Sequence, residues 1–245
     1  MPDGDDYFHK DIIKIMVEAI NQTGSSGEKY DLAIVGCKWT SSYDEDISSS
    51  IIPLYREKTN DELFKTLVKP IENFSAFTSW EKLYRKHFLT GIYFNNYKYA
   101  QDRDQSIRVL LKEPKAIVIP NILYYYVQRV SSAVHSDDYL AVRSECETHF
   151  LCEIIDSMTE DKMKYRHYLF DYLYRSMANW LDFTDDSRVR YACRQIVKET
   201  GWEYLNSQTI KTPGKRVKRI LRISFNRVYR LFGRGIISTH DESGQ

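Results

Sequence analysis

Three clusters of polar side chains carry the residue types that could do chemistry in this chain. The first is Asp3-Gly4-Asp5-Asp6, which stands directly before a predicted helix. Clustered carboxylates bind hard cations through oxygen, and a Mg²⁺ or Mn²⁺ ion held by Asp3, Asp5 and Asp6 can bridge to a diphosphate. The plainer alternative is a helix cap with spare acids, because aspartate favours that position.

The second cluster is Gln101-Asp102-Arg103-Asp104, which begins another predicted helix after an aromatic loop. Asp102 is the candidate general base, because a helix N-terminus keeps a carboxylate ionised and able to accept a proton. The alternative is again a helix cap, with the neighbouring arginines as partners in surface ion pairs.

The third cluster follows the aromatic run Tyr124–Val127, where a predicted strand ends in a cation and two hydroxyls. Arg129 could hold a phosphate oxygen there, with Ser132 as a second donor. The alternative is an edge strand followed by a solvated arginine.

The elements that must position these clusters alternate between strands and helices up to about residue 135. Continuous apolar runs predict buried strands, and apolar residues at helical spacing predict helices. We expect strands at 32–35, 116–119 and 122–127, and helices at 9–21, 60–68, 80–89 and 102–111. Asp5 or Asp6 is expected to cap the first helix. Such alternation is typical of an α/β layer structure.

The pattern changes after Asp137, where nearly everything to Thr200 has helical periodicity. We therefore predict a domain boundary near Ser136. One further helix is expected after Pro213, running to Phe232. The predicted organisation is an α/β part at 1–136, a helical region at 137–210 and a basic tail at 211–245.

The composition indicates a folded chain and not a disordered, fibrous or membrane-spanning one. Of the 245 residues 28% are charged, with Gly 10 and Pro 6, and no apolar run reaches the about 20 residues of a membrane span. Four scattered cysteines indicate reduced thiols in the cytoplasm. Cys146, His149 and Cys152, with Cys193, do not have the spacing of a structural zinc site, so we interpret them as packing residues.

The near-neutral net charge conceals a basic tail. Nine of the 35 lysines and arginines lie between Tyr204 and His240, where there is no acid. Only two of the 34 acids lie beyond that segment, so residues 1–203 carry 26 bases against 32 acids. Such segregation is typical of a chain that meets a charged surface or a polyanion.

Apolar residues recur in the tail at helical spacing and are flanked by bases. They are Val217, Ile220, Leu221, Phe225, Val228 and Leu231. The pattern over 215–232 is typical of a helix that lies in the interface of an anionic membrane. The alternative is a helix packed on the domain with its bases solvated. Nucleic acid is not an expected partner, because no recognised motif accompanies the basic helix.

The order and spacing of the motifs resemble family 2 glycosyltransferases of the GT-A fold. The segment Pro2–Tyr7 is similar to the family's Asp-x-Asp-Asp motif, and Asp31–Gly36 is similar to the apolar strand that follows it. The family's Trp-x-Lys-Leu-Tyr-Arg block is matched by Trp80, Lys82, Leu83, Tyr84 and Arg85. Asp102 matches the Asp of the family's Glu-Asp pair, and Arg129 and Ser132 match its Arg-x-x-Ser ending. The resemblance covers about residues 1–135.

The resemblance implies the C-terminal part of a GT-A (Rossmann-like) mixed sheet with helices, followed by an α-helical region. It also implies inverting transfer of a sugar from a nucleotide-sugar donor to a glycan or lipid-linked acceptor, in the synthesis of a cell-surface polysaccharide. The three N-terminal aspartates would hold Mn²⁺ or Mg²⁺ against the diphosphate, and Asp102 would take the acceptor proton. Arg129 and Ser132 would bind the diphosphate.

Two departures from the family pattern matter. Gln101 stands where the family commonly has Glu, which removes a charge beside the presumed base. The family's nucleotide-binding half also precedes the Asp-x-Asp motif, whereas this chain begins there. We therefore expect a fragment of an enzyme, or one part of a split or oligomeric protein, peripheral on the inner face of the cell membrane. The alternative function is an inactive remnant that docks on a membrane or a partner.

Overall fold

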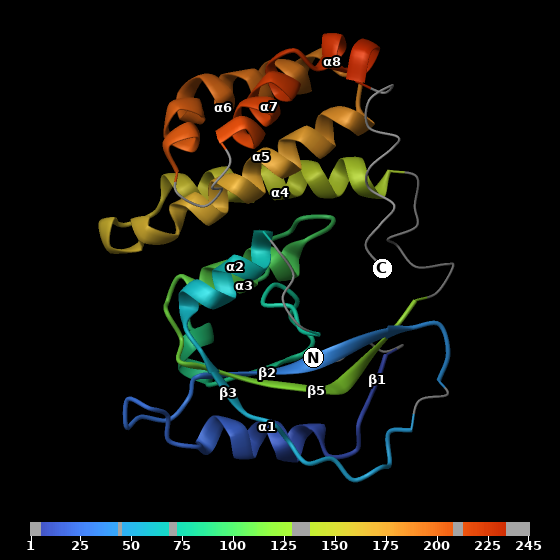
Figure 1. The fold of residues 1–245 in the computed structure, drawn as a ribbon, viewed down its shortest axis with the longest axis vertical. Helices are drawn as coiled ribbons and strands as arrows, with labels where there is room; N and C mark the ends of the chain where they lie inside the picture. The colour runs from blue at the N-terminus through green and yellow to red at the C-terminus, as the bar shows by residue number, and fades with distance from the viewer. Residues whose placement is uncertain (1–5, 44–45, 69–72, 129–137, 208–212, 234–245) are drawn as a thin grey trace. The chain divides into compact units, whose positions relative to one another are not determined.

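The structure is a computed structural model, and it describes residues 6–43, 46–68, 73–128, 138–207 and 213–233 (Figure 1). Contacts divide the chain into two compact units, Met1–Ser136 and Asp137–Gln245. The first unit is mixed α/β and the second is helical. The coarse α/β fold class predicted from the sequence is therefore confirmed, while its assignment to the GT-A fold stays a prediction.

A five-stranded mixed sheet forms the centre of the first unit. Its strands are β1 (Tyr7–Phe8), β2 (Leu32–Thr40), β3 (Arg56–Lys58), β4 (Lys82–Tyr84) and β5 (Ala116–Val127). The long strands β2 and β5 are parallel neighbours. The short strands are antiparallel to them, with β1 and β3 on the free side of β5 and β4 on the free side of β2.

Both long strands are buried on both faces in their first halves, as their continuous apolar runs predicted. β5 does not end at Pro120, so the two predicted strands 116–119 and 122–127 are one. The pairing slips instead, with register shifts on either side of Gly36 in β2. Gly36 permits this because the carbonyl oxygens of Pro120 and Asn121 lie where its Cβ would be.

Helices cover both faces of this sheet (Figure 1). They are α1 (Ile12–Asn21) on one face and α2 (Asn60–Val68) and α3 (Gln101–Leu110) on the other. Ile15 and Met16 of α1 join Ala33 and Val35 of β2 in one buried cluster. The bounds of α2 match the prediction, and a capping box explains its start, because Thr59 and Glu62 exchange hydrogen bonds.

Two further sequence predictions for this unit are wrong. The first helix begins at Ile12, after strand β1, so Asp6 does not cap it. The segment 80–89 is not one helix but strand β4 followed by the 3₁₀ helix Lys86–Leu89. Pairing with β2 outweighed local helical periodicity there, because Leu83 completes the register opposite Ala33.

The second unit is built from helices. They are α4 (Tyr139–Asp156), a 3₁₀ helix (Glu160–Tyr165), α5 (Arg166–Phe183), α6 (Ser187–Asn206), α7 (Pro213–Ser224) and α8 (Asn226–Gly233). The tail is therefore two helices and not the single helix predicted. The side chain of Asn226 at their junction is buried and donates a hydrogen bond to the Leu181 carbonyl. No helix in the described part of the chain is both long and apolar enough to cross a bilayer.

Replacing Gly36 with alanine should destabilise the first unit by about 1–3 kcal/mol, because a methyl group there meets two backbone carbonyls 2.7 Å away. Urea denaturation followed by circular dichroism measures the loss. The control is Gly201→Ala in α6, where the nearest atom is 3.6 Å away and a helical alanine is favoured. Equal stability of Gly36→Ala and the wild type would contradict the close approach.

Candidate active site at the carboxyl end of the central strands

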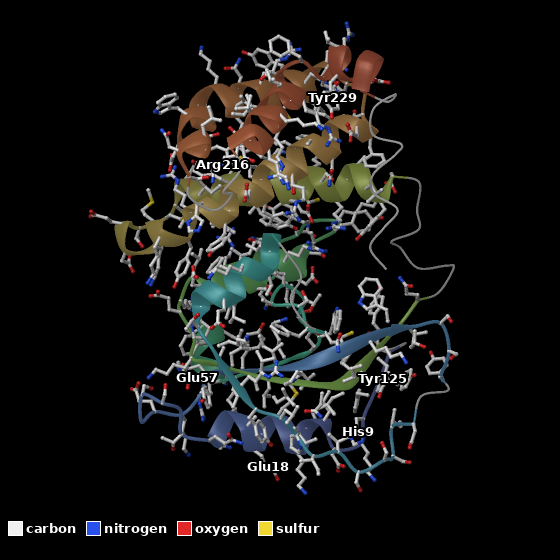
Figure 2. The ribbon with its side chains drawn as sticks, viewed as in Figure 1. His9, Glu18, Glu57, Tyr125, Arg216 and Tyr229 are labelled. Carbon is white, nitrogen blue, oxygen red and sulfur yellow. The ribbon has the colours of Figure 1, made fainter. Side chains whose placement is uncertain are left out.

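The parallel strands β2 and β5 end side by side, and aromatic rings gather on their last residues. Trp80 stacks on Tyr124 and Tyr126 of β5, with ring centroids 4.6 and 5.6 Å apart. Trp39 of β2 packs against Tyr126 at 4.9 Å. Side chains alternate along a strand, so Tyr125 lies on the opposite face, stacked at 4.8 Å on Tyr7 of β1 (Figure 2). An aromatic wall therefore lines one face of this strand end.

Asp6 connects the N-terminal acidic motif to the same strand end. One carboxylate oxygen accepts a hydrogen bond from the Tyr124 hydroxyl at 2.6 Å, and the other accepts one from the Val127 amide at 2.9 Å. Charge-assisted bonds of this kind are strong and directional. The carboxylate of Asp6, the last residue of the motif, is thus held next to Tyr124 at the end of β5. Asp3 and Asp5 lie outside the described residues.

A buried ion pair, Glu81 with Lys82, lies next to Trp80 in sequence. The Lys82 ammonium has almost no exposed surface, lies 3.7 Å from a Glu81 carboxylate oxygen and donates to the carbonyls of Ser75 and Thr78. The same Glu81 oxygen accepts hydrogen bonds from the Ser75 amide at 2.6 Å and the Thr78 hydroxyl at 2.8 Å. The other Glu81 oxygen is buried without a hydrogen-bond partner.

Burial shifts the pKa of both members of this pair toward the neutral form. Loss of solvation raises the pKa of Glu81 to about 7, although the charge of Lys82 works against that shift. Loss of solvation lowers the pKa of Lys82 to about 8, and the charges of Glu81 and Asp102 oppose it. The two groups therefore titrate near neutral pH, which is uncommon outside functional sites.

Asp102 lies in the first turn of α3, as predicted, and interacts electrostatically with Lys82. The turn is entered through Ala100, whose backbone is left-handed with φ 63°. The side-chain amide of Gln101 closes it by donating to the Tyr97 carbonyl. The carboxylate of Asp102 therefore lies at the start of a helix, where the helix dipole favours an anion, and it interacts electrostatically with the buried Lys82 ammonium.

Asp104, two residues further on, has a different role. Its side chain is fully buried, pairs with Arg108 at 2.7 Å and accepts a hydrogen bond from Asn95. The sequence analysis expected the neighbouring arginines to form surface ion pairs. Arg108 instead pairs with the buried Asp104, and Asp104 also holds Asn95 of the loop before α3. Asp104 is therefore a structural residue, which leaves Asp102 as the candidate base of this helix.

Cys37 of β2 interacts with several of these groups. Its thiol interacts electrostatically with Glu81, Asp6 and Lys82, and burial raises its pKa to about 12. A thiol with so high a pKa stays protonated, so Cys37 is not a nucleophile at neutral pH. The structure thus brings together Asp6, the aromatic wall, the Glu81–Lys82 pair and Asp102.

The remaining predicted site residues, Arg129 and Ser132, lie outside the described residues, as do Asp3 and Asp5. The sequence did not single out the Glu81–Lys82 pair, since Lys82 entered only as part of a motif. Two adjacent charged residues, such as Glu81 and Lys82, are normally interpreted as solvent-exposed from the sequence alone. The signal that could have identified the pair is its position at the start of a segment that pairs with a buried strand.

Within the described ranges no group of three His, Cys, Asp or Glu side chains is arranged to hold a metal ion. Asp6 nevertheless fits a metal site formed with the two preceding aspartates. Its carboxylate is held at the end of β5 by the Tyr124 hydroxyl and the Val127 amide, and carboxylate oxygens are the ligands that Mg²⁺ and Mn²⁺ prefer. Metal binding therefore stays a prediction for Asp3, Asp5 and Asp6.

Comparison with known proteins gives limited guidance. No protein-family model matches the chain, and neither does any curated protein. Among solved structures the chain is similar to S. aureus TarS 1-349, at 15% sequence identity and a TM-score of 0.48. The match covers 93% of this chain and 64% of that chain, so this chain spans less than two thirds of that structure. A TM-score this low assigns neither fold family nor function.

Replacing Lys82 with methionine should destabilise the first unit by about 3–5 kcal/mol, because Glu81 loses its buried partner and the carbonyls of Ser75 and Thr78 lose the ammonium that donates to them. Adding Glu81→Gln should recover part of that loss, since glutamine has no ionisable group and its oxygen still accepts from Ser75 and Thr78. Denaturant unfolding of both single variants and the double variant measures the coupling. If the loss of unfolding free energy in the double variant equalled the sum of the two single losses, Glu81 and Lys82 would not be coupled.

The pH dependence of stability gives a second test of the pair. From about pH 4.5 to 7 the unfolded chain loses the Glu81 proton that the folded chain keeps, so wild-type stability should fall relative to the double variant. From about pH 8 to 10.5 the unfolded chain keeps the Lys82 proton that the folded chain has lost, so stability should rise again. If the difference in stability between the wild type and the double variant stayed constant across both pH ranges, the pKa shifts of Glu81 and Lys82 would be ruled out.

Proposed function

We propose that the first unit is the catalytic part of a metal-dependent inverting glycosyltransferase, which moves a sugar from a nucleotide-sugar to a glycan or lipid-linked acceptor. One observation carries the proposal: Asp102, at a helix start, interacts electrostatically with the buried Lys82 ammonium, two residues from Trp80, whose ring stacks on Tyr124 and Tyr126. An ionised carboxylate can accept the proton of an attacking sugar hydroxyl, and aromatic rings can pack on a sugar ring.

Asp102 is the proposed general base. It would accept the proton of the acceptor hydroxyl as that oxygen forms its bond to the anomeric carbon and the nucleoside diphosphate departs. The nearby ammonium of Lys82 favours the ionised carboxylate before the reaction. Positioned bases contribute about 10²–10⁴-fold to a rate.

The N-terminal aspartates and the segment after β5 are the proposed diphosphate site. Asp3 and Asp5, with Asp6 anchored to Tyr124, would hold Mn²⁺ or Mg²⁺, which neutralises charge on a departing diphosphate. Arg129 and Ser132 would add donors to its oxygens. The anchoring of Asp6 at the end of β5 supports this, because the chain continues from that strand end to Arg129.

The aromatic wall is the proposed contact surface for the sugar ring of the acceptor. Aromatic faces pack well on the C–H surface of a ring; Trp80 and Tyr126 are only partly buried and Trp39 is exposed, whereas Tyr124 behind them is fully buried and supports the wall. The alternative function is an inactive remnant that keeps this fold and docks on a membrane surface or a partner. A chain that transfers nothing from nucleotide-sugars with Mn²⁺ to acceptor or water would favour that alternative.

Replacing Asp102 with asparagine should lower turnover by about 10²–10⁴-fold while sparing donor binding, because the variant keeps the size of the side chain and loses the proton acceptor. Release of nucleoside diphosphate from a panel of nucleotide-sugars with Mn²⁺ measures turnover, and calorimetry measures binding. Undiminished turnover would disprove the role of Asp102.

The matched control is Asp104→Asn in the same helix turn. It removes the charge that pairs with Arg108, so it should cost about 1.5–3 kcal/mol of stability. Its turnover per folded molecule should stay near that of the wild type. If Asp104→Asn were instead inactive but stable, Asp104 and not Asp102 would be the general base.

A further inference from the structure

We propose that the outer face of α6, α7 and α8 binds the surface of a membrane that contains anionic phospholipid. The face lies wholly within the second unit and does not depend on the proposed transfer reaction. It is defined by the exposed side chains of Tyr191, Trp202, Val217, Leu221, Phe225 and Val228.

Helix α7 packs against its neighbours with its polar side inward. Arg216 is only 4% exposed and donates to the Leu205 carbonyl at the end of α6 (Figure 2). Arg219 pairs at 3.1 Å with Asp171, a fully buried carboxylate of α5. Arg222 pairs with Asp182 near the end of α5. Three arginines of the tail therefore bind groups of the second unit itself, which the sequence pattern did not predict.

Ile223 of α7 is fully buried, but four other apolar residues of the tail face outward. Val217, Leu221, Phe225 and Val228 are 44–58% exposed and follow one another at helical spacing along α7 and α8. An amphipathic helix docked on its own protein normally buries such a stripe and exposes its charges. Here a contiguous apolar stripe is left on the surface, and a stripe of this kind marks a site of interaction.

Helix α6 extends the same face. Tyr191, Arg194, Lys198 and Trp202 recur at spacings of three and four, so they share one side of α6. Arg194 on that side donates to the Ser224 carbonyl of α7 at 2.9 Å, which places the two rows next to each other. Tyr191 and Trp202 are 66% and 78% exposed. Exposed tryptophan and tyrosine are typical of residues at a membrane–water interface.

Charge identifies the anionic surface. The exposed bases Lys215, Lys218 and Arg227 lie along the apolar stripe, and α6 adds Arg194 and Lys198. The segment from Leu205 to Val228 has no acid. On α6, Glu203 is paired with Arg166, and Glu199, three residues before Trp202, is an exposed acid outnumbered by the five bases of the face. Bases beside an apolar row suit lipid, because the apolar side chains enter the bilayer while the bases contact headgroups. A nucleic acid would leave the apolar row without a partner.

Co-sedimentation of the full chain with vesicles tests the proposal. We expect binding to mixed phosphatidylcholine–phosphatidylglycerol vesicles, weak binding to phosphatidylcholine alone, and weaker binding as salt rises. The pair Lys215→Gln and Lys218→Gln should weaken binding roughly 25-fold, taking about fivefold per base. Leu221→Glu with Phe225→Glu should weaken it more than about tenfold, since apolar burial is lost and two acids are added.

The matched control is Ile52→Glu with Tyr93→Glu, two exposed residues of the first unit at 86% and 77%. That variant should bind vesicles like the wild type. Equal binding to both vesicle types, no binding, or a control as impaired as the tail variants would overturn the proposal. A self-associated chain that dissociates in the tail variants while vesicles stay unbound would instead assign the face to a second copy. No outcome depends on sugar transfer, so an inactive chain that binds vesicles leaves this inference intact.

Discussion

The buried ammonium of Lys82 is the constraint on which the first unit's site depends. A charge without solvent must be surrounded by oxygens, and the loop before β4 supplies them from Ser75, Thr78 and Glu81. That requirement folds residues 73–81 back along β2, where the Glu81 carbonyl accepts a hydrogen bond from the Val35 amide at 3.1 Å. The same charge attracts Asp102 from α3. One lysine thus ties a loop, an edge strand and a helix start into a single arrangement.

The second requirement is that β2 and β5 end together. They pair in parallel from Leu32 and Ala116 to Thr40 and Val127, and the slip at Gly36 keeps them paired past Pro120. Loops that follow parallel strands gather at the carboxyl end, where ligands of open α/β sheets bind. Asp6 then joins the N-terminus to that end through Tyr124. The candidate active site therefore arises from contacts between segments more than a hundred residues apart.

The helical unit follows a different rule, because its tail helix is stabilised by ion pairs and leaves its apolar stripe exposed. Asp171 and Asp182 on α5 determine this orientation, since each takes one arginine of α7. A buried carboxylate is costly unless a cation reaches it, so the arginines turn inward and Val217 and Leu221 turn outward. Interior electrostatics in this unit thus determines which surface is available for binding.

Local sequence determined much of the secondary structure. Helix α2, helix α3 and the helical second unit follow from periodicity and caps, and the buried strands follow from apolar runs. It also located Asp6 and Asp102 as candidate groups. Tertiary structure decided the rest. The segment 80–89 became a strand because β2 needed a partner, Asp104 became structural because Arg108 and Asn95 surround it, and the Glu81–Lys82 pair was brought inside. The inward turn of the tail arginines depends on acids of α5 forty and more residues away. Periodicity reports which residues share a face of an element, but only packing decides what that face meets.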